Sequence, residues 1–67
     1  MEEGLIMPII TVEMLEGRTL EQKKAMVEAI TKSVSEICNC TRESVTIVIH
    51  DMPKTNIAKA GKLLSES

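Results

Sequence analysis

Apolar residues gather in three stretches, and the spacing within each stretch predicts a different element. Residues 8–15 (PIITVEML) and 45–49 (VTIVI) are short apolar runs rich in β-branched residues. Runs of this length and composition are typical of buried strands. Both segments are therefore predicted to be strands with little polar surface.

The third stretch, from Leu20 to about Cys38, has the period of a helix. Its apolar positions recur at steps of three and four: Val27, Ile30, Val34 and Ile37, with Met26, Ala29 and Cys38 beside them. Charges alternate at four-residue spacing on the other face: Lys24, Glu28, Lys32 and Glu36. This pattern predicts a solvated outer face supported by weak ion pairs within the helix.

Both ends of the predicted helix carry recognisable signals. Thr19 followed three residues later by Gln22 matches the capping box that opens many helices. Asn39 is a candidate stop. The remaining segments are a polar connection at 41–43, a turn-rich stretch at 50–56, and residues 57–64, for which periodicity leaves a short hairpin and a frayed helix both open.

The order strand, helix, strand predicts an α/β fold made of one short β-α-β unit with two parallel strands and a C-terminal hairpin or tail. A crossover of this kind is right-handed and places the helix on one face of the sheet. Because both strands are apolar on both faces, one helix leaves a face uncovered, and two strands are too few to be stable alone. We therefore expect several copies of the chain to assemble.

Composition narrows the class of protein further. The chain has 67 residues, a net charge of −2, 43% hydrophobic residues and no Phe, Tyr or Trp. It is one domain at most, of a size that often requires oligomerisation. Without a basic stripe or stacking aromatic residues, no nucleic-acid partner is expected. The apolar runs are too short for a membrane span, and the opening MEEGLI is too short and acidic for a signal peptide, so we expect a cytoplasmic protein.

Several reactive side chains have plain structural interpretations. Cys38 and Cys40 lie too close in sequence for an unstrained disulfide, and His50 is the only histidine that could join them at a metal. We interpret both cysteines as reduced and His50 as a polar surface residue. Three methionines are interpreted as core filler: Met14, Met26 and Met52.

The layout resembles the 4-oxalocrotonate tautomerase family from Pro8 to about Gly61. The most specific match is the opening run from Pro8 to Arg18, with L-E-G-R at 15–18, followed by E-Q-K at 21–23. Weaker matches are Ser44-Val45, Met52 and Ala60-Gly61. The resemblance implies a tautomerase domain at residues 8–67, preceded by an extension at residues 1–7, and a homohexamer built as a trimer of dimers.

The resemblance also implies the chemistry, an enol–keto proton transfer on a small conjugated 2-oxo carboxylate that needs no cofactor. In the family a proline at the mature N-terminus is the general base, which corresponds to Pro8. Arg18 corresponds to an arginine that holds a substrate carboxylate, for which a bidentate guanidinium is well suited. Other positions implied to line the substrate site are Leu15, Ser44, Thr46 and Ile57.

Two positions depart from the family pattern. Thr46 stands where the family has a second arginine, and Ile57 stands where an aromatic residue usually closes the pocket. A threonine hydroxyl carries no charge, so the stabilisation of a developing enolate is reduced. Arg42, nearby in sequence, is one candidate to replace the missing cation.

The proline chemistry has a condition. As long as Met7 precedes Pro8, the nitrogen of Pro8 is an amide without a basic lone pair. Removal of the preceding residues, for example by starting at Met7 and excising it, makes this nitrogen a secondary amine. The alternative is a non-catalytic oligomeric module that keeps the tautomerase fold.

Overall fold

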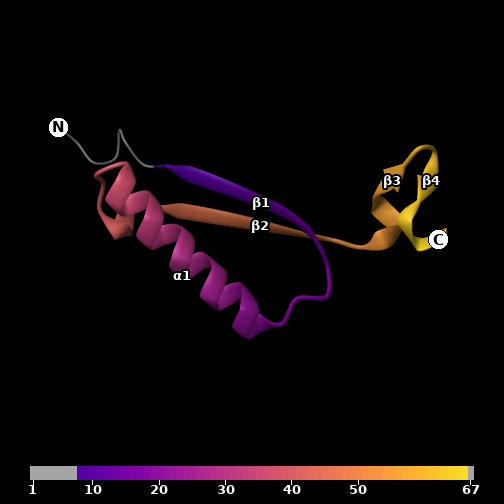
Figure 1. Cartoon of the computed structure of the whole chain (residues 1–67), viewed down its shortest axis with the longest axis horizontal. Helices are drawn as coiled ribbons and strands as arrows, with labels where there is room; N and C mark the ends of the chain where they lie inside the picture. Colours follow the sequence, from indigo (N-terminus) through magenta and orange to yellow (C-terminus); the bar gives the residue numbers. More distant parts are fainter. Residues whose placement is uncertain (1–7, 67) are drawn as a thin grey trace.

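The computed structural model describes residues 8–66, and their elements follow the predicted order (Figure 1). Strand β1 (Ile9–Leu15), helix α1 (Leu20–Ile37) and strand β2 (Thr46–Met52) form the β-α-β unit. A hairpin of β3 (Ala58–Lys59) and β4 (Lys62–Leu63) follows. The α/β fold with two parallel strands, one helix and a C-terminal hairpin is thereby confirmed. The predicted extension, residues 1–7, lies outside the described residues.

Strands β1 and β2 pair in parallel over their whole length. The register runs from Ile9 opposite Thr46 to Leu15 opposite Met52. The second strand is longer than predicted, because residues 50–52, interpreted as part of a turn, continue the ladder opposite the end of β1. The backbone N–H of Glu16 donates to the carbonyl of Met52 at 3.0 Å, which extends this pairing one residue further.

Helix α1 opens with the predicted capping box. The Thr19 hydroxyl accepts from the Gln22 N–H at 3.1 Å, and the Gln22 side-chain oxygen accepts from the Thr19 N–H at 2.9 Å. At the other end the helix is capped by Cys38, and Asn39 takes a left-handed φ of 59° that turns the chain away. Both predicted helix signals are therefore confirmed.

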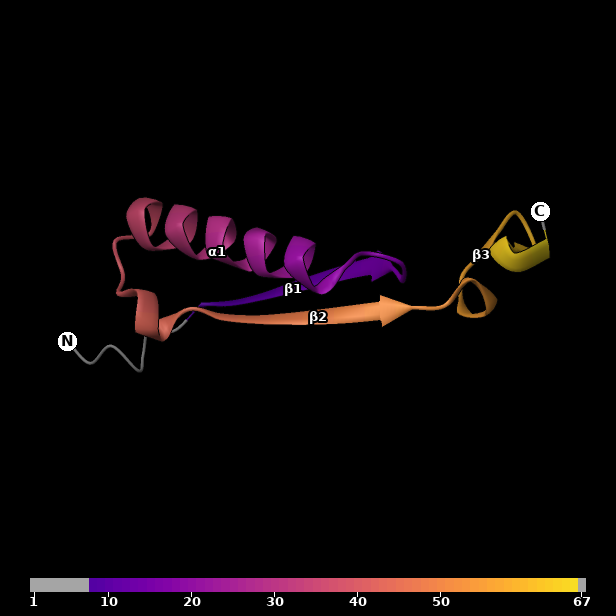
Figure 2. The ribbon, with the colours of Figure 1, turned by 90° about the horizontal axis from the view of Figure 1, so that it is seen from below.

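The helix covers one face of the sheet (Figure 2). Val27, Ile30 and Val34 are half-buried against it, as predicted. Ile37, predicted for the same face, is 82% exposed. The half-buried stripe shifts around the helix towards its C-terminal end, where it consists of Thr31, Val34 and Ser35, so Ile37 falls outside it.

Ion pairs connect different elements, in contrast to the prediction of pairs within the helix. Lys23 of α1 pairs with Asp51 of β2, and Arg42 pairs with Glu28 at 2.8 Å. His50 lies 3.5 Å from Glu13, its direct cross-strand neighbour. The charged residues on the exposed face of α1 therefore stabilise the helix less than expected. The pair of Lys23 with Asp51 instead connects α1 to the sheet.

Residues 58–63 form a hairpin. Of the two structures that periodicity left open for residues 57–64, the hairpin is therefore the one observed, and the frayed helix is not. Its two-residue turn, Ala60-Gly61, has φ of 53° and 81°. Positive φ at both positions is the hallmark of the type I′ turn that suits a tight hairpin. The Leu64 N–H donates to the Ile57 carbonyl at 2.9 Å and closes the base of the hairpin. The hairpin extends beyond the end of β2, away from α1 (Figures 1 and 2).

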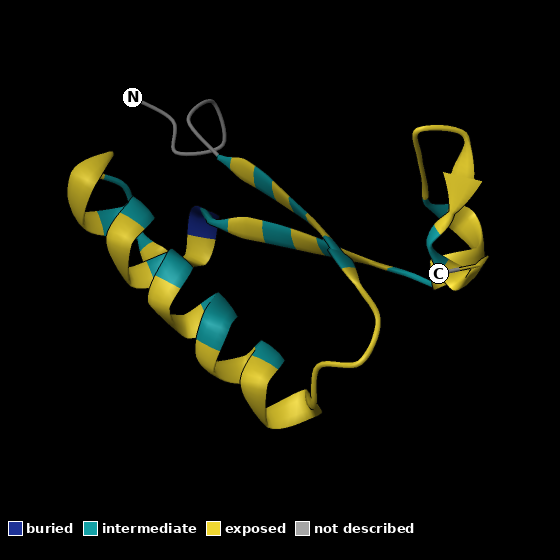
Figure 3. Cartoon of the chain, turned by 45° about the vertical axis from the view of Figure 1, so that its right-hand side comes forward, coloured by how far each residue is buried: buried dark blue, intermediate teal, exposed yellow. Residues whose placement is uncertain are grey.

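The described residues enclose no buried hydrophobic side chain (Figure 3). On the sheet face opposite α1, Ile9 is 66%, Leu15 36% and Val48 39% exposed. This open face is less apolar than predicted, because it also carries four polar residues: Thr11, Glu13, Thr46 and His50. The radius of gyration, 15.6 Å, well exceeds the about 11 Å of a compact chain of this length.

Within residues 8–66, no helix has the length and apolar character to cross a bilayer.

Candidate active site

Pro8 lies at the head of β1, half-buried, and is anchored through its carbonyl. That carbonyl accepts a hydrogen bond from the backbone N–H of Thr46 at 3.0 Å. Proline has no N–H to offer the ladder, so the first position of a strand accommodates it without loss. The sheet therefore fixes the residue while leaving its nitrogen outside the hydrogen-bond network.

The turn beside Pro8 is built by Ser44. Ser44 is 8% exposed, the one buried polar residue in the described part of the chain, and its hydroxyl donates to the Thr41 carbonyl at 2.8 Å. That bond stabilises the short 3₁₀ turn Arg42–Ser44 that leads into β2. The nearby Arg42 is held by Glu28. In one copy Arg42 is thus paired with Glu28, and its role as a replacement for the cation missing at Thr46 stays a prediction.

Arg18 lies past the opposite end of β1. The chain leaves the strand after Leu15 and turns at Gly17, whose φ of 122° suits glycine. The guanidinium of Arg18 has no hydrogen-bond or ion-pair partner within residues 8–66. An unpaired guanidinium beside a structured turn is available to an anion.

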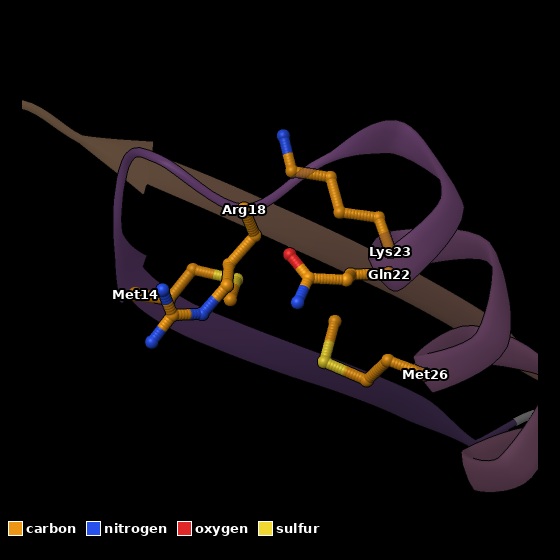
Figure 4. Close-up of a pocket in the computed structure, with 5 residues that line it drawn as sticks. All are labelled: Met14, Arg18, Gln22, Lys23 and Met26. Atoms are coloured by element: carbon orange, nitrogen blue, oxygen red, sulfur yellow. The ribbon is translucent and has the colours of Figure 1, made fainter.

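Arg18 borders a half-open hollow between the end of β1 and the first turns of α1 (Figure 4). The hollow measures about 210 Å³ and is lined by Met14, Arg18, Gln22, Lys23 and Met26. The sequence interpretation of Met14 and Met26 as core filler missed this surface. Helical spacing could not have predicted it, because Arg18 precedes the N-cap Thr19 and only Gln22, Lys23 and Met26 belong to α1.

One copy of the chain does not bring the predicted site residues together. Pro8, Ser44 and Thr46 lie at one end of the sheet, and Leu15 and Arg18 lie at the other, separated by the seven residues of β1. At about 3.3 Å per residue this is roughly 20 Å. Ile57 is half-buried and directly precedes β3, in the hairpin that extends beyond the end of β2 (Figure 1). A site that uses Pro8 and Arg18 together must combine residues from different copies.

Known proteins are similar to this chain over nearly its whole length. The family described as Tautomerase enzyme matches residues 8–67. A probable tautomerase of Bacillus cereus is 48% identical over 60 residues, covering 90% of this chain and 98% of its own length. The 2-hydroxymuconate tautomerase of Bacillus subtilis is 47% identical over 60 residues, covering 90% and 97%.

A solved structure agrees with the sequence comparison. The crystal structure of YwhB, a homologue of 4-oxalocrotonate tautomerase, superposes with a TM-score of 0.84 at 45% identity, covering 90% of this chain and 98% of that chain. The class defined by the fold is thus the small β-α-β subunit with a proline at the head of its first strand. Within that class, the chain belongs to the tautomerase family, of the 4-oxalocrotonate tautomerase type.

Proposed function

We propose that this chain is an isomerase that interconverts enol and keto forms of a small conjugated 2-oxo carboxylate, with the nitrogen of Pro8 as general base. The proposal rests chiefly on the placement of Pro8, which a hydrogen bond from Thr46 fixes at the head of the sheet in a chain of the tautomerase family. The relatives are named tautomerases, one of them for 2-hydroxymuconate.

The proposed step is a proton transfer that leaves the composition of the substrate unchanged. The amine of Pro8 accepts a proton from the carbon next to the carbonyl, and the electron pair of that C–H bond delocalises into an enolate. The resulting ammonium returns the proton to another carbon of the conjugated chain. An α-amino group titrates near about 7.7–8.0, and an apolar setting shifts such a pKa downward, towards the working pH that suits a general base.

This step requires Pro8 to be the first residue. In the 67-residue chain the Pro8 nitrogen is an amide, which is not basic, so that form is predicted to lack proline-dependent turnover. Loss of residues 1–7 converts the same nitrogen to a secondary amine. The proposal is therefore that the active form begins at Pro8.

Arg18 is proposed to hold the substrate carboxylate. Its guanidinium is unpaired within residues 8–66 and can bind a carboxylate through two parallel hydrogen bonds. Because Pro8 and Arg18 of one copy lie roughly 20 Å apart along β1, the Arg18 that serves a given Pro8 belongs to another copy.

A homo-oligomer is therefore part of the proposed function. The absence of buried hydrophobic residues from the described part of the chain, the exposed Ile9, Leu15 and Val48, and the outlying hairpin all support assembly. The resemblance suggests a hexamer. In it, Leu15 and Ile57 would contribute apolar surface to the substrate site, and Ser44 and Thr46 would border the Pro8 end.

A matched set of chains tests the base. The chain starting at Pro8, its Pro8→Ala variant and the 67-residue chain are compared on 2-hydroxymuconate and phenylenolpyruvate, with ketonisation followed by absorbance. We expect turnover only from the chain starting at Pro8, with a loss of at least ~10²-fold on substitution, the usual contribution of a general base. Equal rates for the chain starting at Pro8 and its Pro8→Ala variant would refute the base.

The second candidate is a non-catalytic module that retains the fold. Thr46 favours it, because this residue leaves the Pro8 end without the charge that a second arginine would supply. The same assay separates the two functions. A correctly assembled chain starting at Pro8 that ketonises neither compound faster than buffer supports the module.

A further inference from the structure

Glu13 and His50 are an acid–base pair that the proposed function does not use. The two residues are direct neighbours across β1 and β2, and His50 Nδ1 lies 3.5 Å from Glu13 Oε2. Both side chains are more than half exposed, at 53% for His50 and 59% for Glu13. A pair with this exposure contributes little to the stability of one copy. The informative feature is therefore its place on the open face of the sheet.

The open face surrounds this pair with uncharged residues. Among the residues that β1 and β2 place on that face, Glu13 and His50 are the only ionisable ones. The exposed residues beside them are apolar or carry a hydroxyl: Ile9, Thr11, Leu15, Thr46 and Val48. Helix α1 packs on the opposite face (Figure 2), where Asp51 pairs with Lys23. The charge on the open face therefore comes from Glu13 and His50 alone.

A second copy of the chain suits this face better than a partner of one charge. In a twofold contact, residue i of one copy meets residue j of the other, and j meets i. A copy that places its Glu13 over His50 therefore also places its His50 over Glu13. The exposed side chains of Ile9, Leu15 and Val48 supply apolar area whose burial favours association. A purely acidic or purely basic partner would match only one of the two groups.

Burial in such a contact gives the two charges a larger effect. Charges interact more strongly where water is excluded, and an unpaired charge is costly there. Histidine is the side chain whose charge ordinarily changes between about pH 5 and 8. When His50 is protonated, the charges of the pair are matched, whereas a neutral His50 leaves the Glu13 carboxylate without a cation. Protonation of His50 therefore favours the assembled form.

We propose that the open face is a contact between copies whose strength depends on pH through the Glu13–His50 pair. The proposal rests on the assembly that the proposed function requires and adds its regulation. The contact is strongest near about pH 6, where the carboxylate is ionised and the imidazole protonated, and weakens as the imidazole loses its proton. Because Pro8 and Arg18 act from different copies, pH then controls how many complete sites form.

Sedimentation velocity of the full chain at constant ionic strength tests this dependence without substrate. We expect the concentration for half-dissociation to rise at least about tenfold from about pH 6 to about pH 8, a change that the coupling of one close charge pair at an interface can produce. His50 is the only histidine, so His50→Gln should remove most of this dependence. An unchanged dependence in His50→Gln, or a parent chain whose dissociation does not vary with pH, would overturn the proposal.

Glu13→Gln distinguishes the charge pair from a merely structural contact. Without the carboxylate, a protonated His50 is an uncompensated charge in the contact, so the assembly should weaken rather than strengthen towards about pH 6. The variant that combines Glu13→Gln with His50→Gln should show little dependence on pH. Glu36→Gln, on the exposed side of α1, is the matched control and should keep the parent profile. A Glu13→Gln profile with the same sign as that of the parent would refute the pair.

These measurements separate the contact from the chemistry of Pro8. A chain that assembles with the expected pH dependence but lacks turnover supports the contact and contradicts only the base. An assembly equally tight at about pH 6 and about pH 8 refutes the pair and leaves the base untouched. A parent chain that stays monomeric at every pH contradicts both the assembly and this inference.

Discussion

Thr46 and Pro8 adjoin at the head of the sheet through the hydrogen bond from the Thr46 N–H to the Pro8 carbonyl. This contact places the side chain of residue 46 beside the proposed base. Thr46 is exposed, on the face that α1 does not cover. A charged side chain at position 46 would therefore lie next to the proposed base.

A guanidinium at position 46 should change which substrates react. In the chain starting at Pro8, Thr46→Arg is expected to raise kcat/KM for 2-hydroxymuconate by about 10²-fold, the contribution typical of one preorganised donor to a developing oxyanion. Ala25→Arg, on the exposed side of α1, is the control for added charge. Steady-state kinetics of both variants measure the effect, and an equal gain in Ala25→Arg would contradict a local role.

Roles for individual residues were predicted from the sequence only where a motif carries them. Those of Pro8 and Arg18 rest on the run L-E-G-R and its distance from the proline, and both stay predictions. Gln22 was predicted as part of the capping box, and its reciprocal bonds with Thr19 confirm that role. Ser44 was predicted at the substrate site, and the structure gives its hydroxyl a bond within the turn. That substrate role stays a prediction.

Among the elements, α1 is the one whose ends depend most on residues close to them in sequence. The reciprocal bonds between Thr19 and Gln22 satisfy two backbone donors at its start. Its first turn also carries Gln22 and Lys23, which line the hollow. The capping box therefore stabilises the helix and fixes the helix start that borders the hollow.

Loss of the cap should be measurable as stability. Thr19→Ala is expected to lower the free energy of unfolding by about 1 kcal/mol, because the hydroxyl acceptor at the N-cap is removed. Urea denaturation at fixed chain concentration measures the change. Ser33→Ala, at an exposed position inside α1, should change stability in the opposite direction by a few tenths of a kcal/mol, owing to the higher helix propensity of alanine.

The elements were predicted well where their signals are local and less well where tertiary pairing decides. Helix and caps follow from periodicity and from Thr19, Gln22 and Asn39. The end of β2 was predicted too early, since His50 and Asp51 extend the strand only because β1 pairs with them. The hairpin at the end of the chain depends on Ala60 adopting positive φ, which alanine seldom does.

On the scale of the whole molecule, one copy is an incomplete structure. It spans 50 × 25 × 16 Å, buries no hydrophobic side chain among its described residues, and leaves Ile9, Leu15 and Val48 exposed on the open face. Pro8 and Arg18 lie at opposite ends of β1. Assembly is thus expected to serve both the stability and the chemistry of the protein.

A charge on the open face should disrupt that assembly. Val48→Lys places an unpaired ammonium in the middle of the face and is expected to raise the concentration for half-dissociation at least about tenfold, because burying such a charge costs several kcal/mol. Ala25→Lys, on the exposed side of α1, should leave assembly unchanged. Sedimentation velocity measures both, and a parent chain that sediments as a stable 7.4 kDa monomer would contradict the assembly.

The central claim is that Pro8 works as a free amine. Intact mass spectrometry of the protein purified from its native cells tests it most directly. We predict a mass that corresponds to residues 8–67, without the seven residues MEEGLIM. A mass that includes those seven residues would leave the Pro8 nitrogen as an amide and would contradict the proline-base mechanism.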